Sequence, residues 1–415
     1  MITLTQMGQN AKVAEQQLSQ LSTIKKNQVL KAMASKIREN SAAILKANEI
    51  DMYYAQNNGV RKVMLDRLKL DEARINSMAD GLEEVASLAD PIGEVLKGWT
   101  TEAGLDISQI RVPMGVIGMI YEARPNVTVD AAGLTFKAGS AVILRGGKEA
   151  IHSNQALVTA LRAALTCEHI LADDIQLVTD TSHETATALM ELTEYLDVLI
   201  PRGSAKFIQM VVQKAKVPVI ETGAGNCHVY VDEGADLQMA TNIVVNAKTQ
   251  RPSVCNAMEK LVVNQAVAEK LLPMVARALK PFNVDLRGDA RAKQILPEIS
   301  LANDDDWGTE YNDYIMAIKI VDNLDQAIAH INRYNTKHSE AIITNNYAHS
   351  ERFTKKIDAA VVYVNASTRF TDGYEFGFGA EIGISTQKLH ARGPMGLNEI
   401  TSTKYVIRGN GQVRK

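Results

Sequence analysis

Residues Val116–Arg145 read VIGMIYEARPNVTVDAAGLTFKAGSAVILR, and this stretch decides the fold class. Two short apolar runs, Val116–Tyr121 and Ala141–Arg145, are typical of strands that are buried on both faces. Between them, Thr128–Ala138 has the length and composition of a helix. Because two parallel strands need a long crossover, we expect one strand-helix-strand unit of a parallel sheet.

The same alternation of short apolar runs and helical segments continues along the chain. It pauses at the glycines of residues 223–226 and then restarts, which predicts two α/β domains with parallel sheets. A helical lead-in from Asn10 to about Ala89 comes first, because apolar residues there recur at helical spacing. Further strands are predicted at Ile175–Val178, Val198–Ile200, Val217–Glu221, Val229–Val231, Lys260–Val263, Ile315–Val321, Ala341–Thr344 and Val361–Asn365, with helices at Ser153–Ala164, Glu184–Leu192 and Ser204–Lys214.

Two further segments stand outside this alternation. Thr403–Ile407 follows a glycine-rich loop and has no helix after it, and Asp106–Arg111 lies where helical periodicity is lost. We expect the two to pair as an antiparallel arm that contacts another subunit. The alternative is that the final segment is an ordinary edge strand.

Composition narrows the class of partner. The 415 residues include 45 basic and 48 acidic side chains, a net charge of −3, which gives no electrostatic footprint for nucleic acid or an anionic membrane. Three cysteines without a CxxC pair argue against a disulfide framework and for a reducing compartment. No signal-peptide pattern occurs, and no apolar run approaches the ~20 residues that span a bilayer. We therefore expect a cytoplasmic protein whose partners are small molecules.

Cys255 is the first candidate for chemistry. It lies in TQRPSVCNAMEKLVV (Thr249–Val263), downstream of the apolar run VPVIETGAG (Val217–Gly225) that contains Glu221. A strand, a glycine turn and a helix before a cysteine indicate a positioned nucleophile. The alternative stays open, because an unpaired cysteine is often a small buried core residue.

Two turns that follow predicted strands combine glycine with cations. The run PMGVIGMI (Pro113–Ile120) does not supply the GxGxxG motif of the usual dinucleotide fold. Instead, AVILRGGKEA carries Arg145 and Lys148 beside a Gly-Gly turn, and DVLIPRGSAKF puts Gly203 and Ser204 at a helix N-terminus suited to phosphate. Two cations at a ribose-binding turn favour a 2′-phosphate. The alternative is that they are solvated turn residues.

Together these motifs resemble the aldehyde dehydrogenase superfamily over nearly the whole chain. In that superfamily a Pro-Asn pair ends the first strand, a Lys-Ala-Gly-Asn-like turn precedes the next, and a Glu-x-Gly-Gly-like turn lies upstream of the catalytic cysteine. The blocks ARPNVTVDAAGL, QRPSVCNAMEKLVV and VDNLDQAIAHINRYNTKHSEAI (Val321–Ile342) look most like the branch that reduces an acyl phosphate. One departure is Asn335, where a smaller residue is usual, and we interpret it as variation in a loop.

The resemblance implies an aldehyde dehydrogenase-like α/β fold and a reaction. Residues 1–104 and 113–224 are expected to form an NADP-binding domain, residues 225–395 a catalytic domain, and residues 105–112 and 396–415 a small β arm for oligomerisation. The implied enzyme is an NADPH-dependent oxidoreductase that converts L-glutamyl 5-phosphate to L-glutamate 5-semialdehyde and phosphate, the second step of proline biosynthesis from glutamate. A homo-oligomer is implied, and an association with glutamate 5-kinase is expected because acyl phosphates are labile.

Catalytic roles also follow from the resemblance. Cys255 is the implied nucleophile that forms a thioester, and the Asn126 amide with the Cys255 N–H is the implied oxyanion hole. Because thiolate is the reactive form, we expect a helix N-terminus to stabilise it, with Arg251 as a second aid. Glu221 stands where oxidative relatives carry the base that activates water. A reductase of acyl phosphates must avoid that water, so we expect an accessory role, with structural support of the turn as the alternative.

The resemblance further assigns the cofactor and substrate contacts. Glu310 is placed at the nicotinamide ribose, Gly203 and Ser204 at the pyrophosphate, and Arg145 and Lys148 at the adenosine end. NADPH is the expected cofactor, because Lys148 stands where NAD-preferring relatives often carry an acid. No metal site is expected, since no three ligands have suitable spacing. The candidates for the amino-acid end of the substrate are Arg124, Ser385, Thr386 and Arg392.

Two other functions remain to be weighed. A coenzyme A-acylating aldehyde dehydrogenase shares the cysteine thioester but transfers the acyl group to a thiol, and the three sequence blocks argue against it. A noncatalytic NADP-binding or assembly protein that keeps the fold is disfavoured by the joint presence of Cys255, Asn126 and Glu310.

Overall fold

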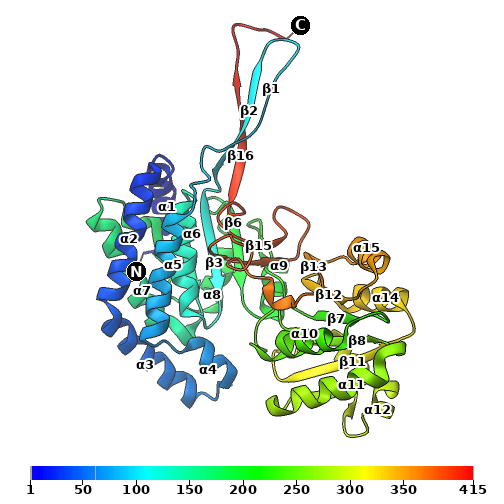
Figure 1. The fold of residues 1–415 in the computed structure, drawn as a ribbon. Helices are drawn as coiled ribbons and strands as arrows, with labels where there is room; N and C mark the ends of the chain where they lie inside the picture. The colour runs from blue at the N-terminus through cyan, green and yellow to red at the C-terminus, as the bar shows by residue number, and fades with distance from the viewer. Residues whose placement is uncertain (1, 61, 415) are drawn as a thin grey trace. The chain divides into compact units, whose positions relative to one another are not determined.

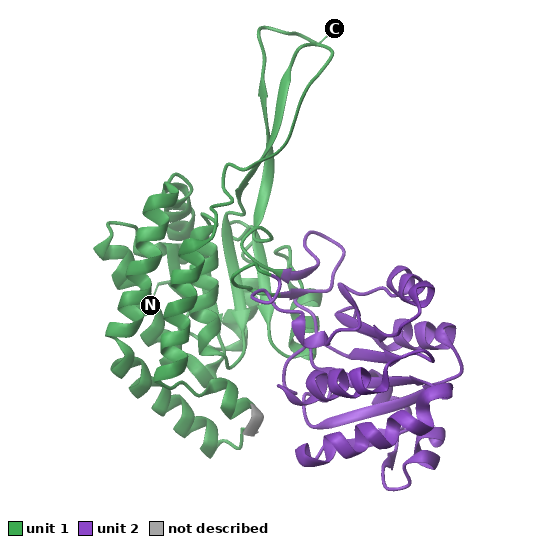
Figure 2. Cartoon of the chain, in the orientation of Figure 1, with its two compact units in different colours: residues 1–221, 377–383, 395–415 green, residues 222–376, 384–394 purple. Residues whose placement is uncertain are grey.

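The computed structural model describes residues 2–60 and 62–414, and contacts within the chain divide it into two compact units. Unit 1 comprises residues 1–221, 377–383 and 395–415, and unit 2 comprises residues 222–376 and 384–394 (Figure 2). The first boundary therefore falls three residues before the one expected from the sequence.

Within the described residues, unit 1 begins with five helices, drawn in shades of blue in Figure 1. Their bounds are α1 Leu4–Leu18, α2 Thr23–Glu39, α3 Ser41–Asn57, α4 Lys62–Leu68 and α5 Glu72–Ser87. The side chains of Thr3, Ser22 and Asp71 cap α1, α2 and α5 by accepting a backbone N–H of the first turn. The predicted helical lead-in is confirmed, and it begins at Leu4 rather than Asn10 because Thr3 supplies the cap.

The first sheet has the strand order β5-β4-β3-β6, and all its pairs are parallel. Its strands are β3 Val116–Tyr121, β4 Ala141–Gly146, β5 Ile175–Leu177 and β6 Val198–Arg202, and its helices are α6 Pro125–Lys137, α7 Ile151–Cys167, α8 His183–Met190 and α9 Ala205–Lys214. Strands β3 and β4 are buried along their whole length. The strand-helix-strand unit that the opening stretch predicts is confirmed, because β3 and β4 pair in parallel across α6.

The predicted strand Val217–Glu221 is wrong as a full strand. Only Val219 forms an isolated parallel bridge, with Leu199 of β6. Pro218 has no backbone N–H and cannot donate to a ladder, so the segment contributes the Pro218 carbonyl and the Ile220 N–H instead.

The second sheet lies in unit 2 and has the order β10-β9-β11-β8-β7-β12-β13, again with parallel pairs. Its strands are β7 Cys227–Val231, β8 Met258–Asn264, β9 Asp285–Gly288, β10 Ser300–Leu301, β11 Ile315–Val321, β12 Ser339–Ile343 and β13 Val361–Val364. The helices are α10 Leu237–Thr249, α11 Gln265–Leu279, α12 Ala290–Ile295, α13 Asp304–Gly308, α14 Leu324–Tyr334 and α15 Tyr347–Lys356. The prediction of a second parallel sheet is confirmed, and β9 and β10 are strands that the sequence did not reveal.

An antiparallel arm belongs to unit 1 and extends as a narrow ribbon in Figure 1. It contains β1 Val95–Thr100, β2 Asp106–Pro113 and β16 Thr401–Arg408 in the order β1-β2-β16. The predicted pairing of the last strand with residues 106–111 is confirmed. The expected arm was incomplete, however, because β1 pairs with β2 although residues 1–104 were expected to belong to the cofactor domain.

Residues 377–383 belong with unit 1, although they were expected in the catalytic domain. Two contacts explain this. A Cβ on Gly379 would lie 2.7 Å from the Leu88 side chain, and Glu381 lies 4.0 Å from Arg202. The glycine-containing segment of residues 377–394 is therefore divided, with 377–383 in unit 1 and 384–394 in unit 2.

Candidate active site

Cys255 lies in a turn of residues 251–257 that connects the end of α10 to the start of β8 in unit 2. Its side chain is half-buried. The expectation that Cys255 stands at a helix N-terminus is wrong, because the preceding helix α10 ends at Thr249 and the segment that follows the turn is a strand. The helix end that precedes the turn is a C-terminal one, whose dipole does not favour an anion.

Gly225 packs directly on the peptide of Cys255. A Cβ at Gly225 would lie 1.4 Å from the Cys255 carbonyl oxygen and 2.6 Å from its Cα, so only glycine fits. The Gly225 N–H donates to Glu310 Oε1 at 2.7 Å. The structure therefore joins Cys255 and Glu310 through the Gly225 peptide, within unit 2.

A second thiol supports the same turn. Cys227, at the start of β7, is buried, and its S–H donates to the Cys255 carbonyl at 3.2 Å. Burial raises the pKa of Cys227 well above its usual range. Cys227 is therefore a protonated core thiol, whereas Cys255 is half-exposed and Cys167 lies on the surface of unit 1.

A short 3-10 turn, Thr368–Phe370, is fastened to the residue after the cysteine. Asn256 Nδ2 donates to the Thr371 carbonyl at 2.8 Å, and Thr368 Oγ1 donates to the Asn256 carbonyl at 2.7 Å. These bonds place Arg369 beside the cysteine turn, where its Nε donates to Gln250 Oε1 at 2.9 Å. Burial lowers the pKa of Arg369, and the charge on Cys255 opposes that shift.

Sequence reasoning missed Arg369 as a site residue. Its substrate candidates in this part of the chain were Ser385, Thr386 and Arg392, which lie further along. The missing signal is long-range, because only the hydrogen bonds to Asn256 bring this arginine to the cysteine.

Asn126 lies in unit 1 at the start of α6, directly after Pro125 at the first helical position. Its side chain is exposed, and Nδ2 donates to Asp130 Oδ2 at 3.0 Å, one turn further along the helix. Burial raises the pKa of Asp130 to about 6, and the hydrogen bond from Asn126 opposes that shift. Asp130, which the sequence did not single out, therefore fixes the direction of the Asn126 amide.

The start of α9 carries the phosphate-binding candidates, and a carboxylate already lies there. The Ser204 N–H donates to Glu122 Oε2 at 2.6 Å, and Ser204 Oγ donates to Oε1 at 3.1 Å. A Cβ on Gly203 would lie 2.6 Å from the same carboxylate. The anion-binding end of α9 is thus suited to negative charge, and Glu122 fills it in the free chain.

The two cations of the Gly-Gly turn have different environments. Lys148 is exposed at the start of the 3-10 helix Lys148–Ala150. Arg145 is 8% exposed and donates through Nη2 to the carbonyls of Thr181 and Ser182 at 2.6 and 3.1 Å. Its Nε is buried without a hydrogen-bond partner among the described residues, and burial lowers the pKa of Arg145.

The candidates for the amino-acid end of the substrate do not share one environment. Arg392 forms an ion pair with Asp358 at 2.8 Å. Ser385 is buried, and its hydroxyl has no hydrogen-bond partner within residues 2–60 and 62–414. Thr386 packs its methyl group on Gly223. Arg124, in unit 1, is the residue before α6.

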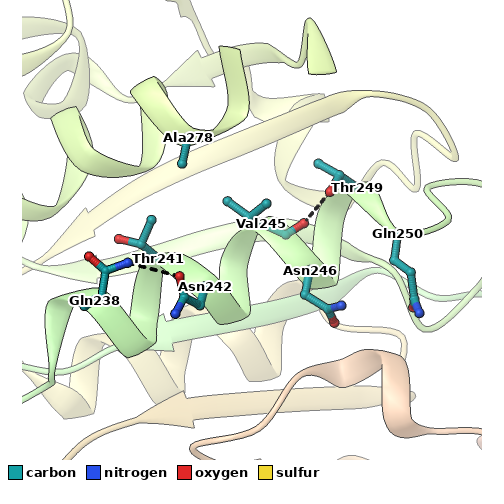
Figure 3. A pocket seen from close by; sticks show the side chains of 8 residues that line it. All are labelled: Gln238, Thr241, Asn242, Val245, Asn246, Thr249, Gln250 and Ala278. Atoms are coloured by element: carbon teal, nitrogen blue, oxygen red, sulfur yellow. Dashed lines mark hydrogen bonds between the residues drawn. The ribbon is translucent and has the colours of Figure 1, made fainter. Parts of the chain in front are cut away.

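A hollow of about 470 Å³ runs along α10, and Figure 3 shows that amide and hydroxyl side chains line much of it. Its lining consists of Gln238, Thr241, Asn242, Val245, Asn246, Thr249, Gln250 and Ala278. In the part of the chain that the structure describes, no three His, Cys, Asp or Glu side chains are grouped to hold a metal ion. No helix within the described ranges is long and apolar enough to cross a membrane.

Comparisons with known proteins show what the whole chain is similar to. The sequence model of the aldehyde dehydrogenase family matches residues 3–307 and 309–406. The chain is 61% identical over 414 residues to the gamma-glutamyl phosphate reductase of Lactiplantibacillus plantarum, covering 100% of both chains. It is 61% identical over 411 residues to that of Enterococcus faecalis, covering 99% of each chain.

A solved structure shows the same likeness in three dimensions. The gamma-glutamyl phosphate reductase of Thermotoga maritima matches with a TM-score of 0.96 and 47% identity, covering 99% of this chain and 100% of that one.

Proposed function

The chain belongs to the aldehyde dehydrogenase family and groups within it with the gamma-glutamyl phosphate reductases, and we infer that it is an oxidoreductase of proline biosynthesis. Its reaction is the reduction of L-glutamyl 5-phosphate to L-glutamate 5-semialdehyde with release of phosphate. The observation that carries this inference is the 61% identity, which extends over the full length of both chains.

Cys255 is proposed as the nucleophile. It is half-buried in a supported turn, whereas its neighbour Cys227 is buried and protonated. The sulfur attacks the activated carbonyl, an S–C bond forms, and the C–O bond to phosphate breaks. Because phosphate leaves with the electron pair of that bond, the step needs no strong general acid, and a thioester remains on Cys255.

Asn126 is proposed as a side-chain donor to the oxyanion, the role that family membership implies. One hydrogen of its amide is bound to Asp130, so the direction of the other is set before substrate arrives. An amide held in this way stabilises developing negative charge without first having to reorient.

A nicotinamide dinucleotide is the cofactor, as in the family, and when bound in its reduced form it supplies hydride to the thioester carbonyl. We propose NADPH. Lys148 is exposed beside the Gly-Gly turn, and Arg145 has a buried Nε without a partner among the described residues, so both have capacity for a 2′-phosphate. Glu310 holds the Gly225 N–H with Oε1, which leaves Oε2 to accept from a ribose hydroxyl.

Glu221 is proposed as an accessory residue rather than a base, because hydrolysis of the thioester would waste the substrate. Ser385, Thr386 and Arg124 remain proposed contacts for the amino-acid end. Arg392 is the weakest of these, since its guanidinium already pairs with Asp358.

A homo-oligomer is proposed through the arm. Strands β1 and β16 are the outer strands of a three-stranded sheet, and β1 is exposed along its whole length. An outer strand offers unpaired backbone groups to another chain. An association with glutamate 5-kinase is proposed on the lability of the substrate, and co-elution of the two proteins in gel filtration tests it.

The reverse reaction tests the proposed function. Glutamate 5-semialdehyde and NADP should give NADPH at a rate that depends on inorganic phosphate, because phosphate must cleave the thioester. A rate that depends on coenzyme A instead would assign the chain to the acylating branch. The ratio of kcat/KM for NADPH and NADH in the forward direction tests the choice of cofactor.

A further inference from the structure

Two arginines flank the cysteine turn without a carboxylate partner. Arg251 begins the turn and is exposed, and Arg369 lies half-buried on the 3-10 turn that is fastened to Asn256. Among residues 2–60 and 62–414, neither guanidinium has a carboxylate oxygen within 4.0 Å; Asp372 acts on Arg369 only from a longer range. The charge of Arg251 and the charge on Cys255 both act on Arg369.

The contacts of Arg369 hold its backbone and its Nε and leave its two Nη groups available to bind a ligand. Its backbone N–H donates to Ser367 Oγ at 3.3 Å, and its Nε donates to Gln250 Oε1 at 2.9 Å. The two Nη groups have no hydrogen-bond partner among the described residues. A half-buried cation with a fixed stem and two unused donor groups is suited to an anion that presents several oxygens.

The proposed reaction brings such an anion to this place. An acyl phosphate carries its phosphoryl group one atom away from the carbonyl that the sulfur attacks. Two negatively charged groups, thiolate and phosphate, must therefore approach each other. As the S–C bond forms and the C–O bond breaks, negative charge grows on the departing oxygen. Cations beside the cysteine turn offset the repulsion and stabilise that charge.

We propose that Arg251 and Arg369 form the subsite for the phosphoryl group of the substrate and for the phosphate that leaves. This inference rests on the proposed function and names the residues that make it specific for an acyl phosphate. Arg369 is the fixed donor and Arg251 the exposed one, so Arg369 carries the larger part of the binding. The same subsite takes up inorganic phosphate in the reverse reaction.

The test is the KM for phosphate in the reverse reaction, measured for Arg369→Gln and Arg251→Gln. We expect Arg369→Gln to raise this KM about tenfold or more, with the KM for NADP unchanged, because a charge-assisted contact is lost. Arg251→Gln should raise it less, and Arg369→Lys should fall between wild type and Arg369→Gln, because lysine keeps the charge but not the fork. Arg352→Gln, an exposed arginine paired with Asp325 in the same unit, is the matched control.

A binding measurement complements the kinetics. Phosphate at millimolar concentration should slow the alkylation of Cys255 by iodoacetamide in wild type and in Arg352→Gln, and much less in Arg369→Gln. Arg251 is exposed, so its variant reports on the subsite even if Arg369→Gln fails to fold.

The outcomes separate the two proposals. If wild type shows no dependence on phosphate, the proposed function is wrong. If wild type depends on phosphate but both glutamine variants keep its KM and its protection, only the subsite is wrong. The subsite is likewise wrong if the glutamine variants shift the pH profile of Cys255 alkylation but keep the KM for phosphate of wild type. The arginines would then act on the thiol alone.

Discussion

The Cα of Gly225 faces the carbonyl of Cys255 so closely that a Cβ there would lie 1.4 Å from the oxygen. The cysteine turn can therefore take this position only because residue 225 has no side chain. The same peptide reaches Glu310 through its N–H, so one small residue joins the cysteine turn to the proposed ribose-binding carboxylate.

Gly225→Ala should reduce kcat by about 100-fold or more, because the added methyl group must displace the cysteine turn. Gly234→Ala is the matched control, since a Cβ there has no atom within 4 Å. Steady-state turnover and thermal unfolding check both variants. Normal turnover of the Gly225 variant would show that the turn tolerates displacement.

Asn126→Ala should lower kcat by about 100-fold or more through loss of an oxyanion donor. Asp130→Ala should lower it about tenfold, because the amide loses the partner that directs it. The double variant should be no slower than Asn126→Ala, since Asp130 acts through the amide. If the double variant instead lost kcat by the product of the two single losses, Asp130 would act independently of Asn126.

Glu122→Gln should tighten the binding of NADP several-fold. The carboxylate at the start of α9 holds the Ser204 N–H in the free chain and competes with the pyrophosphate for the same donors. Glutamine keeps an acceptor oxygen but removes the charge. Fluorescence titration with NADP measures the effect, and weaker binding would mean that Glu122 contacts the cofactor instead.

Asp174 should make stability depend on pH. It is buried, and neither carboxylate oxygen has a hydrogen-bond partner among the described residues. Burial, with the charges of Asp173 and Glu15, raises its pKa to about 8. Because the folded state holds the proton longer than the unfolded chain, whose pKa is about 4, the free energy of unfolding falls as pH rises between these values.

Asp174→Asn removes this titration. The variant should be more stable than wild type at pH 8, by several kcal/mol, and similar to it near pH 4. Urea unfolding at both pH values checks the difference. An equal difference at the two pH values would place the effect in packing rather than in protonation.

The sequence predicted the buried parts of the fold well. Strands β3 and β11 have their predicted bounds because a strand covered on both faces is mainly apolar; β3 is apolar throughout, and Lys319 is the one polar residue of β11. Strand β10 is the edge strand of its sheet and β9 lies next to it; both are short and carry polar residues, so no such run marks them. Strand β1 is exposed along its length and has no local signal of burial.

The candidate site was predictable only in part. Cys255 and Glu310 stand in recognisable motifs, and the structure brings them to one peptide. Arg369 reaches the cysteine turn through hydrogen bonds to Asn256, a contact between distant segments that no local pattern reveals. The contact of Glu122 with the N-terminal end of α9 could be recognised only in the structure, where the Ser204 N–H donates to its carboxylate.

The formation of a thioester on Cys255 is the central claim, and peptide mapping after a rapid acid quench tests it most directly. Enzyme mixed with glutamate 5-semialdehyde and NADP, without phosphate, should carry a glutamyl group on the peptide that contains Cys255, and Cys255→Ser should carry none. A glutamyl group on Cys227 or Cys167 instead, or an adduct that persists in Cys255→Ser, would contradict the account.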